Sequence, residues 1–283
     1  MASITVDNAA RPRPLRELLR DVWRARDLVW VLARQQFATR YRREVFGVLW
    51  AVLVPLAQAL VLALVFTYLR AARAGGRPSP VFDTGDVSYP VFIFVGITVW
   101  TFFLNSITAG ASSIISKSGM TTKVYFPRIV LPAVEVLNAG FGYIIALGTA
   151  LAMAFVLQDV DVRSLALLPA AIALATVLSF AVAAVLGALS VYYRDIRYVL
   201  GAITRAWFFL TPVIYPLSYA RGVLRYVTLA NPVTGPVELA HVAIFGGEFP
   251  TSAVWSTCAW TVGFMVVALI FYHRRDRLLA DPL

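Results

Sequence analysis

Residues 46–69 read FGVLWAVLVPLAQALVLALVFTYL, an unbroken stretch of 24 residues without an acidic or basic side chain. A helix of about 20 apolar residues is long enough to cross the ~30 Å hydrocarbon core of a bilayer. The whole 283-residue chain is 60% hydrophobic and 14% charged, whereas a soluble domain carries about 25% charged residues. The composition therefore excludes an ordinary soluble fold and predicts an integral membrane protein.

Further apolar runs of similar length follow the first one. Read between charged breaks, the chain has six predicted spans, at residues 46–69, 90–114, 131–157, 165–191, 199–217 and 252–272. Residues 61–66 do not alternate between apolar and polar side chains as a β-barrel strand would. We therefore predict an all-α integral membrane fold with a cytoplasmic N-terminal segment at 1–45, a six-helix transmembrane domain at 46–272 and a cytoplasmic tail at 273–283.

The distribution of basic residues predicts the orientation, because Lys and Arg are enriched in cytoplasmic loops. With the six predicted spans, eighteen Lys and Arg residues fall on the side of the two termini and six on the other side. Both termini are therefore expected in the cytoplasm, in a multi-pass protein of the inner membrane. The net charge of +10 follows this loop pattern and implies no nucleic-acid partner.

An amphipathic pattern precedes the first span. Apolar residues recur there at helical spacing, and charged residues fill the opposite face. The apolar positions are Leu15, Leu18, Leu19, Val22 and Trp23. With its basic flank, this stretch predicts an interface helix that lies at the cytoplasmic membrane surface. A helix that merely packs against the bundle is the alternative.

The sequence offers no pattern for catalysis or nucleotide binding. No glycine is followed by lysine, so the phosphate-binding loop G-x-x-x-x-G-K-[ST] is absent from the chain. His241 and His273 fall on opposite sides of the membrane in this topology, and the spacing of His241 from Glu238 favours a solvated polar pair. Cys258 is interpreted as a packing residue. We predict no catalytic residue, no metal site and no cofactor in this chain, with ATP and Mg bound by a separate subunit.

Two ionisable residues fall inside predicted spans, Glu135 in the third and Arg205 in the fifth. Charge in lipid costs about 2.5–3.5 kcal/mol on insertion scales, so such residues usually face the bundle interior and have a partner. On a helix, Glu135 shares a polar stripe with Asn138, Gly142 and Thr149. The stripe is either the wall of a pathway or polar contact between helices, and Arg205 is either inside the bundle or extended to the interface.

Aromatic residues are frequent in the second and fifth predicted spans, where Trp207, Thr211 and Tyr215 repeat at a spacing that places them on one helix face. Such rings either stack on sugars or form belts at the membrane surface. The candidate pathway residues are Trp100, Phe103, Glu135, Asn138, Trp207, Thr211 and Tyr215.

Prolines interrupt the end of the fifth predicted span. Pro212 removes a helix hydrogen bond, and irregular backbone at membrane depth survives only where protein or a water-filled cavity satisfies it. This segment is therefore expected to border a channel. Asn231-Pro232 and Gly235-Pro236 then divide the following loop into pieces at 219–229 and 233–246, which we predict to be short re-entrant gate helices between the fifth and sixth spans.

Several short motifs lie in the order found in a known family. They are Arg40-Tyr41-Arg42, Phe46-Gly47-Val48-Leu49-Trp50 with Pro55, Lys123-Val124-Tyr125-Phe126-Pro127-Arg128 with Leu131-Pro132, Tyr192-Tyr193-Arg194-Asp195-Ile196, Thr211-Pro212-Val213-Ile214-Tyr215-Pro216 and Asn231-Pro232. Over about residues 28–275, the chain thereby resembles the permease subunits of ABC exporters for O-antigen, teichoic acid and galactan.

The resemblance implies a homodimer of six-span permeases with two copies of a nucleotide-binding ATPase. The substrate would be a polysaccharide on a polyprenyl pyrophosphate carrier, moved outward through the membrane for cell envelope biogenesis. By the same resemblance, residues 117–128 couple the permease to the ATPase. The coupling residues would be Lys117, Lys123, Tyr125, Phe126, Pro127 and Arg128, with Tyr193, Arg194 and Asp195 on the same cytoplasmic face.

Two other functions fit parts of the sequence. One is a permease for drugs or small lipids from the same superfamily. The other is a membrane-embedded glycosyltransferase or flippase-like enzyme, which would need an acidic cluster at the membrane surface. The external acidic residues, Asp83, Asp86, Asp159 and Asp161, lack a metal-binding spacing, which disfavours the enzyme.

Overall fold

The computed structural model describes residue 20 and residues 23–42, 44–74, 87–117, 127–157, 160–193 and 195–275. Within these residues the chain is helical and forms no strand, which confirms the predicted all-α membrane fold. In this part of the chain, five helical segments are long and apolar enough to cross a membrane. They are Gly47–Tyr68, Tyr89–Ser116, Val130–Leu157, Ser164–Tyr192 and Thr251–His273.

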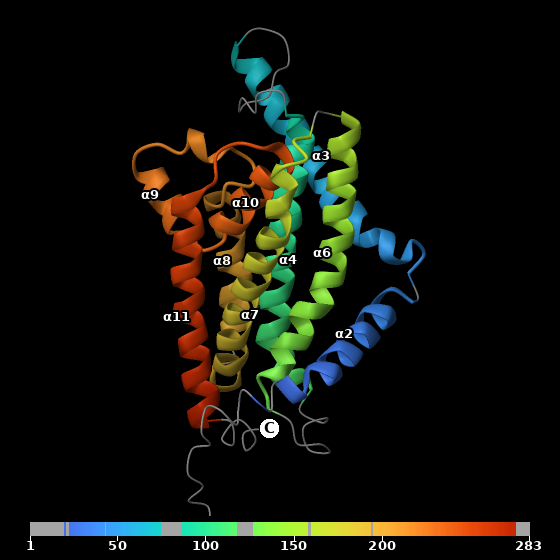
Figure 1. Cartoon of the computed structure of the whole chain (residues 1–283), viewed down its shortest axis with the longest axis vertical. Coiled ribbons are helices and arrows are strands. Elements are labelled where there is room, and N and C mark those ends of the chain that lie inside the picture. Colours follow the sequence, from blue (N-terminus) through green and yellow to red (C-terminus); the bar gives the residue numbers. More distant parts are fainter. Residues whose placement is uncertain are drawn as a thin grey trace, which may run out of the picture.

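The helices follow one another in an antiparallel bundle (Figure 1). In chain order, the described elements are α2 (Arg26–Tyr41), η1 (Gly47–Leu49), α3 (Trp50–Ala74), α4 (Tyr89–Ser116), α6 (Val130–Leu157), η2 (Ser164–Leu167), α7 (Leu168–Tyr192), α8 (Ile196–Leu210), η3 (Leu217–Tyr219), α9 (Val223–Ala230), α10 (Thr234–Phe245) and α11 (Thr251–Arg275). The long helices α3, α4, α6, α7 and α11 correspond to five of the six predicted spans.

Helix α4 is the centre of the bundle, and Figure 1 shows it between α6 and α7. Every residue from 91 to 100 is buried. At its other end α4 approaches α7 very closely, because a Cβ atom at Gly110 would lie 2.5 Å from the Cβ of Ala183. Small residues at such a crossing let two membrane helices pack backbone against backbone.

The fifth predicted span, 199–217, is wrong as a single helix. Helix α8 has 15 residues, which corresponds to about 22 Å at 1.5 Å per residue and is short of the bilayer core. It ends at Leu210 because Pro212 has no N–H to continue the helix. The backbone turns at once, with the Val213 N–H donating to the Thr211 carbonyl at 2.7 Å. The described residues therefore do not confirm six full-length spans, and Tyr215 does not share a helix face with Trp207.

The short helices α9 and α10 match the two pieces expected between the last spans, to within a few residues. Both lie at the end of the bundle opposite α2 (Figure 1). Residues 211–214, which follow α8, are buried within the protein. The carbonyl of Ile214 accepts a hydrogen bond from the Tyr89 hydroxyl at 3.0 Å, which places this segment beside the start of α4.

Helix α2 was not predicted as a separate element. Its side chains Val29, Ala33 and Phe37 are spaced by four residues and pack against the N-terminal half of α6. Of the predicted interface helix, Leu15, Leu18, Leu19 and Val22 lie outside the described residues. Trp23 is described and is 68% exposed. Because the other four positions are not described, the helix at the membrane surface stays a prediction.

Candidate functional site

Three of the predicted pathway residues lie together in an aromatic cluster between α4 and α8. The ring centroid of Trp100 lies 6.0 Å from that of Phe103 and 6.2 Å from that of Trp207. Phe103 and Trp207 are 5.5 Å apart, and Phe208 lies 5.7 Å from Trp100. These distances and the edge-on angles are typical of favourable aromatic pairs. Trp100 and Phe103 are buried, so the cluster mainly joins the two helices.

One side of the aromatic cluster borders a groove of about 580 Å³ on the face shared by α3, α4 and α8. Its apolar walls include Val61, Trp100 and Phe208, and its polar groups come from Gln58, Thr204 and Arg205. We call it the α3–α8 groove. Arg205 and Phe209 line it and are exposed, so Arg205 does not lie inside the bundle of this chain.

Trp207 and Thr211 meet at a polar joint centred on Asn231. The Trp207 indole N–H donates to Asn231 Oδ1 at 2.9 Å, and Asn231 Nδ2 donates to Thr211 Oγ1 at 2.8 Å. Asn231 Oδ1 also accepts from the Val233 N–H at 3.0 Å. The joint therefore connects the end of α8 to the α9–α10 turn. Tyr215 lies nearby, with its hydroxyl 3.5 Å from Thr228 Oγ1.

Glu135 and Asn138 lie away from this aromatic cluster. Glu135 Oε1 is 2.5 Å from Lys117 Nζ, and it accepts a hydrogen bond from Gln36 Nε2 at 3.3 Å. These three residues, which we call the ion-pair node, join the end of α4 to α6 and α2. Both charged side chains are at most 13% exposed. Glu135 was predicted in a transport pathway, whereas its partner is Lys117, a predicted coupling residue.

The ion-pair node flanks the predicted coupling segment. Lys117 is its first residue, and at its far end Pro127 is buried and Arg128 is half-buried. Lys123, Tyr125, Phe126 and Arg194 lie outside the described residues. Tyr193 and Asp195 are exposed and line a cavity of about 500 Å³ at the turn from α7 to α8. Gly187 of α7 lies beside Pro132 of α6, so this turn is at the same end of the bundle as the node.

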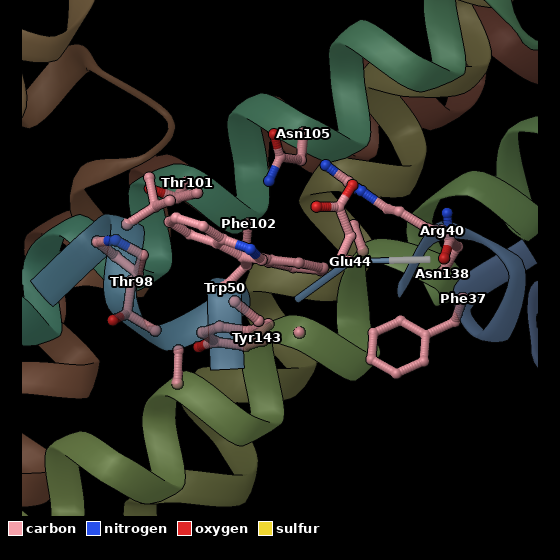
Figure 2. A pocket seen from close by; sticks show the side chains of 16 residues that line it. Phe37, Arg40, Glu44, Trp50, Thr98, Thr101, Phe102, Asn105, Asn138 and Tyr143 are labelled. Carbon is pink, nitrogen blue, oxygen red and sulfur yellow. The ribbon is translucent and has the colours of Figure 1, made fainter. Parts of the chain in front are cut away.

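Asn138 lines a different cavity, of about 360 Å³, between α2, α3, α4 and α6, which we call the lateral cavity (Figure 2). Its polar lining residues are Arg40, Glu44, Thr98, Thr101, Asn105, Asn138 and Tyr143, and its aromatic ones include Phe37, Trp50 and Phe102. Arg40 and Trp50 belong to motifs quoted above, but of these residues only Asn138 was predicted to line a pathway. They come from four elements, and no periodicity in the sequence predicts how those elements pack.

His241 was predicted in a solvated pair with Glu238, and this is wrong, because His241 is buried and Glu238 is largely shielded from solvent. His241 Nδ1 lies 3.9 Å from Glu238 Oε1, with the two side chains 6% and 13% exposed. The imidazole stacks on Phe92 at 3.9 Å between ring centroids, and its Nε2 lies 3.1 Å from the Phe92 carbonyl oxygen. The histidine therefore helps to hold α10 against α4.

Five long apolar helices, with the short helix α8 ending just before Pro212, define the described part of the chain as a multi-pass helical membrane protein. Residues 27–245 match the ABC-2 type transporter family, which covers most of the chain, and the chain belongs to that family.

Three O-antigen export permeases are similar to this chain. The O-antigen export system permease protein RfbA of Myxococcus xanthus is 30% identical over 201 residues, which cover 71% of this chain and 73% of that protein. Two proteins of that name from Klebsiella pneumoniae are 22% and 23% identical over 212 residues, or 75% of this chain and 77% of each relative.

Proposed function

We propose that this protein is the transmembrane subunit of an ATP-driven exporter that moves lipid-linked polysaccharide out of the cytoplasm. The observation that carries the proposal is the match to the ABC-2 type transporter family together with similarity to three proteins named as O-antigen export permeases. The cargo would be an O-antigen, galactan or teichoic-type polymer on a polyprenyl pyrophosphate carrier.

The exporter would contain two copies of this chain and two copies of a separate ATPase that binds ATP and Mg. Both termini would face the cytoplasm, in the inner membrane. The predicted coupling segment, 117–128, would then lie on the ATPase side with the exposed Tyr193 and Asp195, since its described residues and this pair lie at one end of the bundle. The ion-pair node would transmit movement of this segment to α4, α6 and α2 at once.

The α3–α8 groove is the part of the surface best suited to form the pathway wall. It is open and largely apolar, and it is lined by exposed Phe209 and Arg205 beside the aromatic cluster. Aromatic rings can stack on the apolar faces of sugars, and the guanidinium has several donors for hydroxyl groups. A second copy of the chain would close the groove into a channel.

The first test is depletion of the protein in its native host, followed by quantification of lipid-linked glycans on each side of the membrane. We expect polyprenyl-linked polymer to accumulate on the cytoplasmic side. Intact surface glycan without such accumulation would contradict the proposal and favour export of drugs or small lipids.

The pathway wall has its own test in the same host. Phe209→Ala removes an exposed ring from the groove, and we expect it to reduce glycan export while the complex with the ATPase still assembles. Val177→Ala is the matched control, because Val177 is an exposed apolar residue of α7 that does not line the groove. Equal export by both variants would exclude the groove as the wall.

A further inference from the structure

We propose that Arg205 binds the diphosphate that joins the glycan to its lipid carrier, while the cargo passes the middle of the membrane. The inference rests on the proposed function and deepens it, because it makes the α3–α8 groove selective for anionic lipid-linked glycans. Stacking of sugars on aromatic rings would act equally on charged and neutral glycolipids, so the arginine supplies a selectivity that the rings cannot supply.

Arg205 lies near the middle of the bundle. Helices α4 and α8 run antiparallel (Figure 1), and Trp100 pairs with Phe208 at 5.7 Å between ring centroids. The same register brings Thr204 beside Leu104, and both residues line the groove with Arg205. Leu104 is 15 residues from Tyr89 and 12 residues from Ser116, the two ends of α4, which corresponds to about 22 Å and 18 Å. A bundle that is centred in the bilayer therefore holds Arg205 close to the midplane.

An arginine at this depth needs a partner or water. Ionisable residues are unfavourable at the centre of a bilayer and usually face a pathway there. Extension to the membrane surface does not help, because Ile196, where α8 begins, is nine residues away, or about 14 Å along the helix. Arg205 is exposed, and within the described residues no carboxylate forms an ion pair with it.

A second copy of the chain offers no carboxylate at this depth. The described helices from α3 to α11 contain two acidic residues, Glu135 and Glu238. Glu135 is five residues from the start of α6 and is already paired in the ion-pair node. Glu238 lies beside His241, which stacks on Phe92, three residues from the opposite end of the bundle at the start of α4. The partner of Arg205 is therefore expected to be an anion that enters the groove.

The guanidinium group is well suited to a phosphate. It is planar and charged, and it can donate two parallel hydrogen bonds to phosphate oxygens. Gln58 lines the groove from α3 and can add an uncharged donor. No carboxylate is among the described lining residues, so an anion meets no repulsion there. The diphosphate is the most highly charged part of the cargo, and an opposite charge attracts it most strongly where the dielectric constant is low.

The test measures export by the permease–ATPase complex reconstituted in proteoliposomes, with ATP on the ATPase side. The probes are a polyprenyl diphosphate that carries a short glycan and a neutral lipid in which the same glycan is joined to polyprenol without phosphate. We expect the unmodified complex to prefer the diphosphate lipid. Arg205→Gln should slow its export by about tenfold, the effect of one lost charge-assisted hydrogen bond. Arg205→Lys should slow it less, because lysine keeps the charge.

Arg197→Gln is the matched control, because Arg197 is an exposed arginine of the same helix that does not line the groove. Copurification with the ATPase shows that each variant assembles. Equal export by Arg205→Gln and the unmodified complex would overturn the proposal. An equal loss in Arg205→Gln and Arg205→Lys would also overturn it, and so would equal export of the two lipids by the unmodified complex.

Binding of the sugarless polyprenyl diphosphate separates this inference from the proposed function. It is measured on the same complex in nanodiscs and compared with binding of phosphatidylglycerol. If Arg205→Gln weakens this binding but the unmodified complex exports no glycan, the anion site stands and the proposed function is wrong. If the complex exports glycan and Arg205→Gln changes neither export nor binding, the function stands and the site is wrong. Equal, Arg205-dependent affinity for phosphatidylglycerol would assign the site to a bilayer lipid and overturn recognition of the cargo.

Discussion

At the scale of single residues, the amide of Asn231 joins the end of α8 to the α9–α10 turn. Asn231→Ala would leave the Trp207 indole N–H and the Val233 N–H without their acceptor. Each buried donor left unpaired costs about 1–3 kcal/mol. We expect faster hydrogen exchange in residues 228–236 of the variant, measured by mass spectrometry on the purified complex. Unchanged exchange there would show that the joint contributes nothing to the stability of this region.

Trp207→Phe tests whether the indole stabilises the protein mainly through its hydrogen bond to Asn231. The substitution removes the N–H donor and keeps an aromatic ring beside Trp100 and Phe103. Since Trp207 and Asn231 share a hydrogen bond, the two substitutions should be less than additive in a double-mutant cycle. Denaturation in SDS, followed by circular dichroism, measures the four free energies. Full additivity would mean that the two side chains stabilise the protein independently.

The ion-pair node makes a second prediction at this scale. Glu135→Gln would leave the Lys117 ammonium, which is 13% exposed, without its carboxylate. Breaking a fully buried pair costs about 3–5 kcal/mol, and this pair at a helix end should cost less. The exchanged variant, Lys117→Glu with Glu135→Lys, should recover part of the lost free energy of unfolding. If the free energy of unfolding of the exchanged variant is no higher than that of Glu135→Gln, charge pairing does not stabilise the node.

At the scale of elements, the contact of α4 with α7 depends on the absence of a side chain at Gly110. A Cβ atom there would lie 2.5 Å from the Cβ of Ala183, so Gly110→Ala forces the two helices apart. Such overpacking costs about 1–3 kcal/mol. Gly148→Ala is the matched control, since no atom lies within 4 Å of a Cβ at Gly148. We expect a lower unfolding midpoint for Gly110→Ala only, and equal midpoints would contradict the close packing.

The elements also show how far the sequence predicts this fold. Apolar runs located five long helices because lipid demands about 20 apolar residues in a helix, and the proline and glycine pairs located α9 and α10. The fifth span was overestimated because Pro212, Val213 and Ile214 are apolar yet lie in a buried turn beside α4. Helix α2 was missed although Val29, Ala33 and Phe37 repeat at helical spacing, because its apolar stripe lies among arginines and resembles no span.

The candidate sites were less predictable than the helices. Glu135 was expected to face the bundle interior and to have a partner, in a pathway wall or in a polar contact between helices. No spacing along the chain predicts that this partner is Lys117, at the end of another helix. The lateral cavity could not be predicted for the same reason, because its lining residues come from four elements that pack together only in the folded protein. The aromatic cluster was partly predictable. Its members were selected because they are aromatic, but no pattern in the sequence indicated that Trp100 and Phe103 are buried.

At the scale of the whole molecule, the orientation in the membrane remains a prediction from basic residues, and exposed positions at the two ends of the bundle can test it. Arg197 is exposed at the start of α8, at the end of the ion-pair node. Ser218 is exposed after the turn that packs beside the start of α4, at the opposite end. With Cys258 replaced by Ala, the variants Arg197→Cys and Ser218→Cys each carry one exposed thiol.

A membrane-impermeant maleimide applied to intact cells should label the thiol at position 218 and spare that at position 197. The reason is that the basic end is expected in the cytoplasm, where the reagent does not enter. In permeabilised cells both thiols should be labelled. This control shows that the ATPase does not cover position 197. The reverse pattern in intact cells would invert the molecule and place the predicted coupling segment on the outer side, where the ATPase has no access to it.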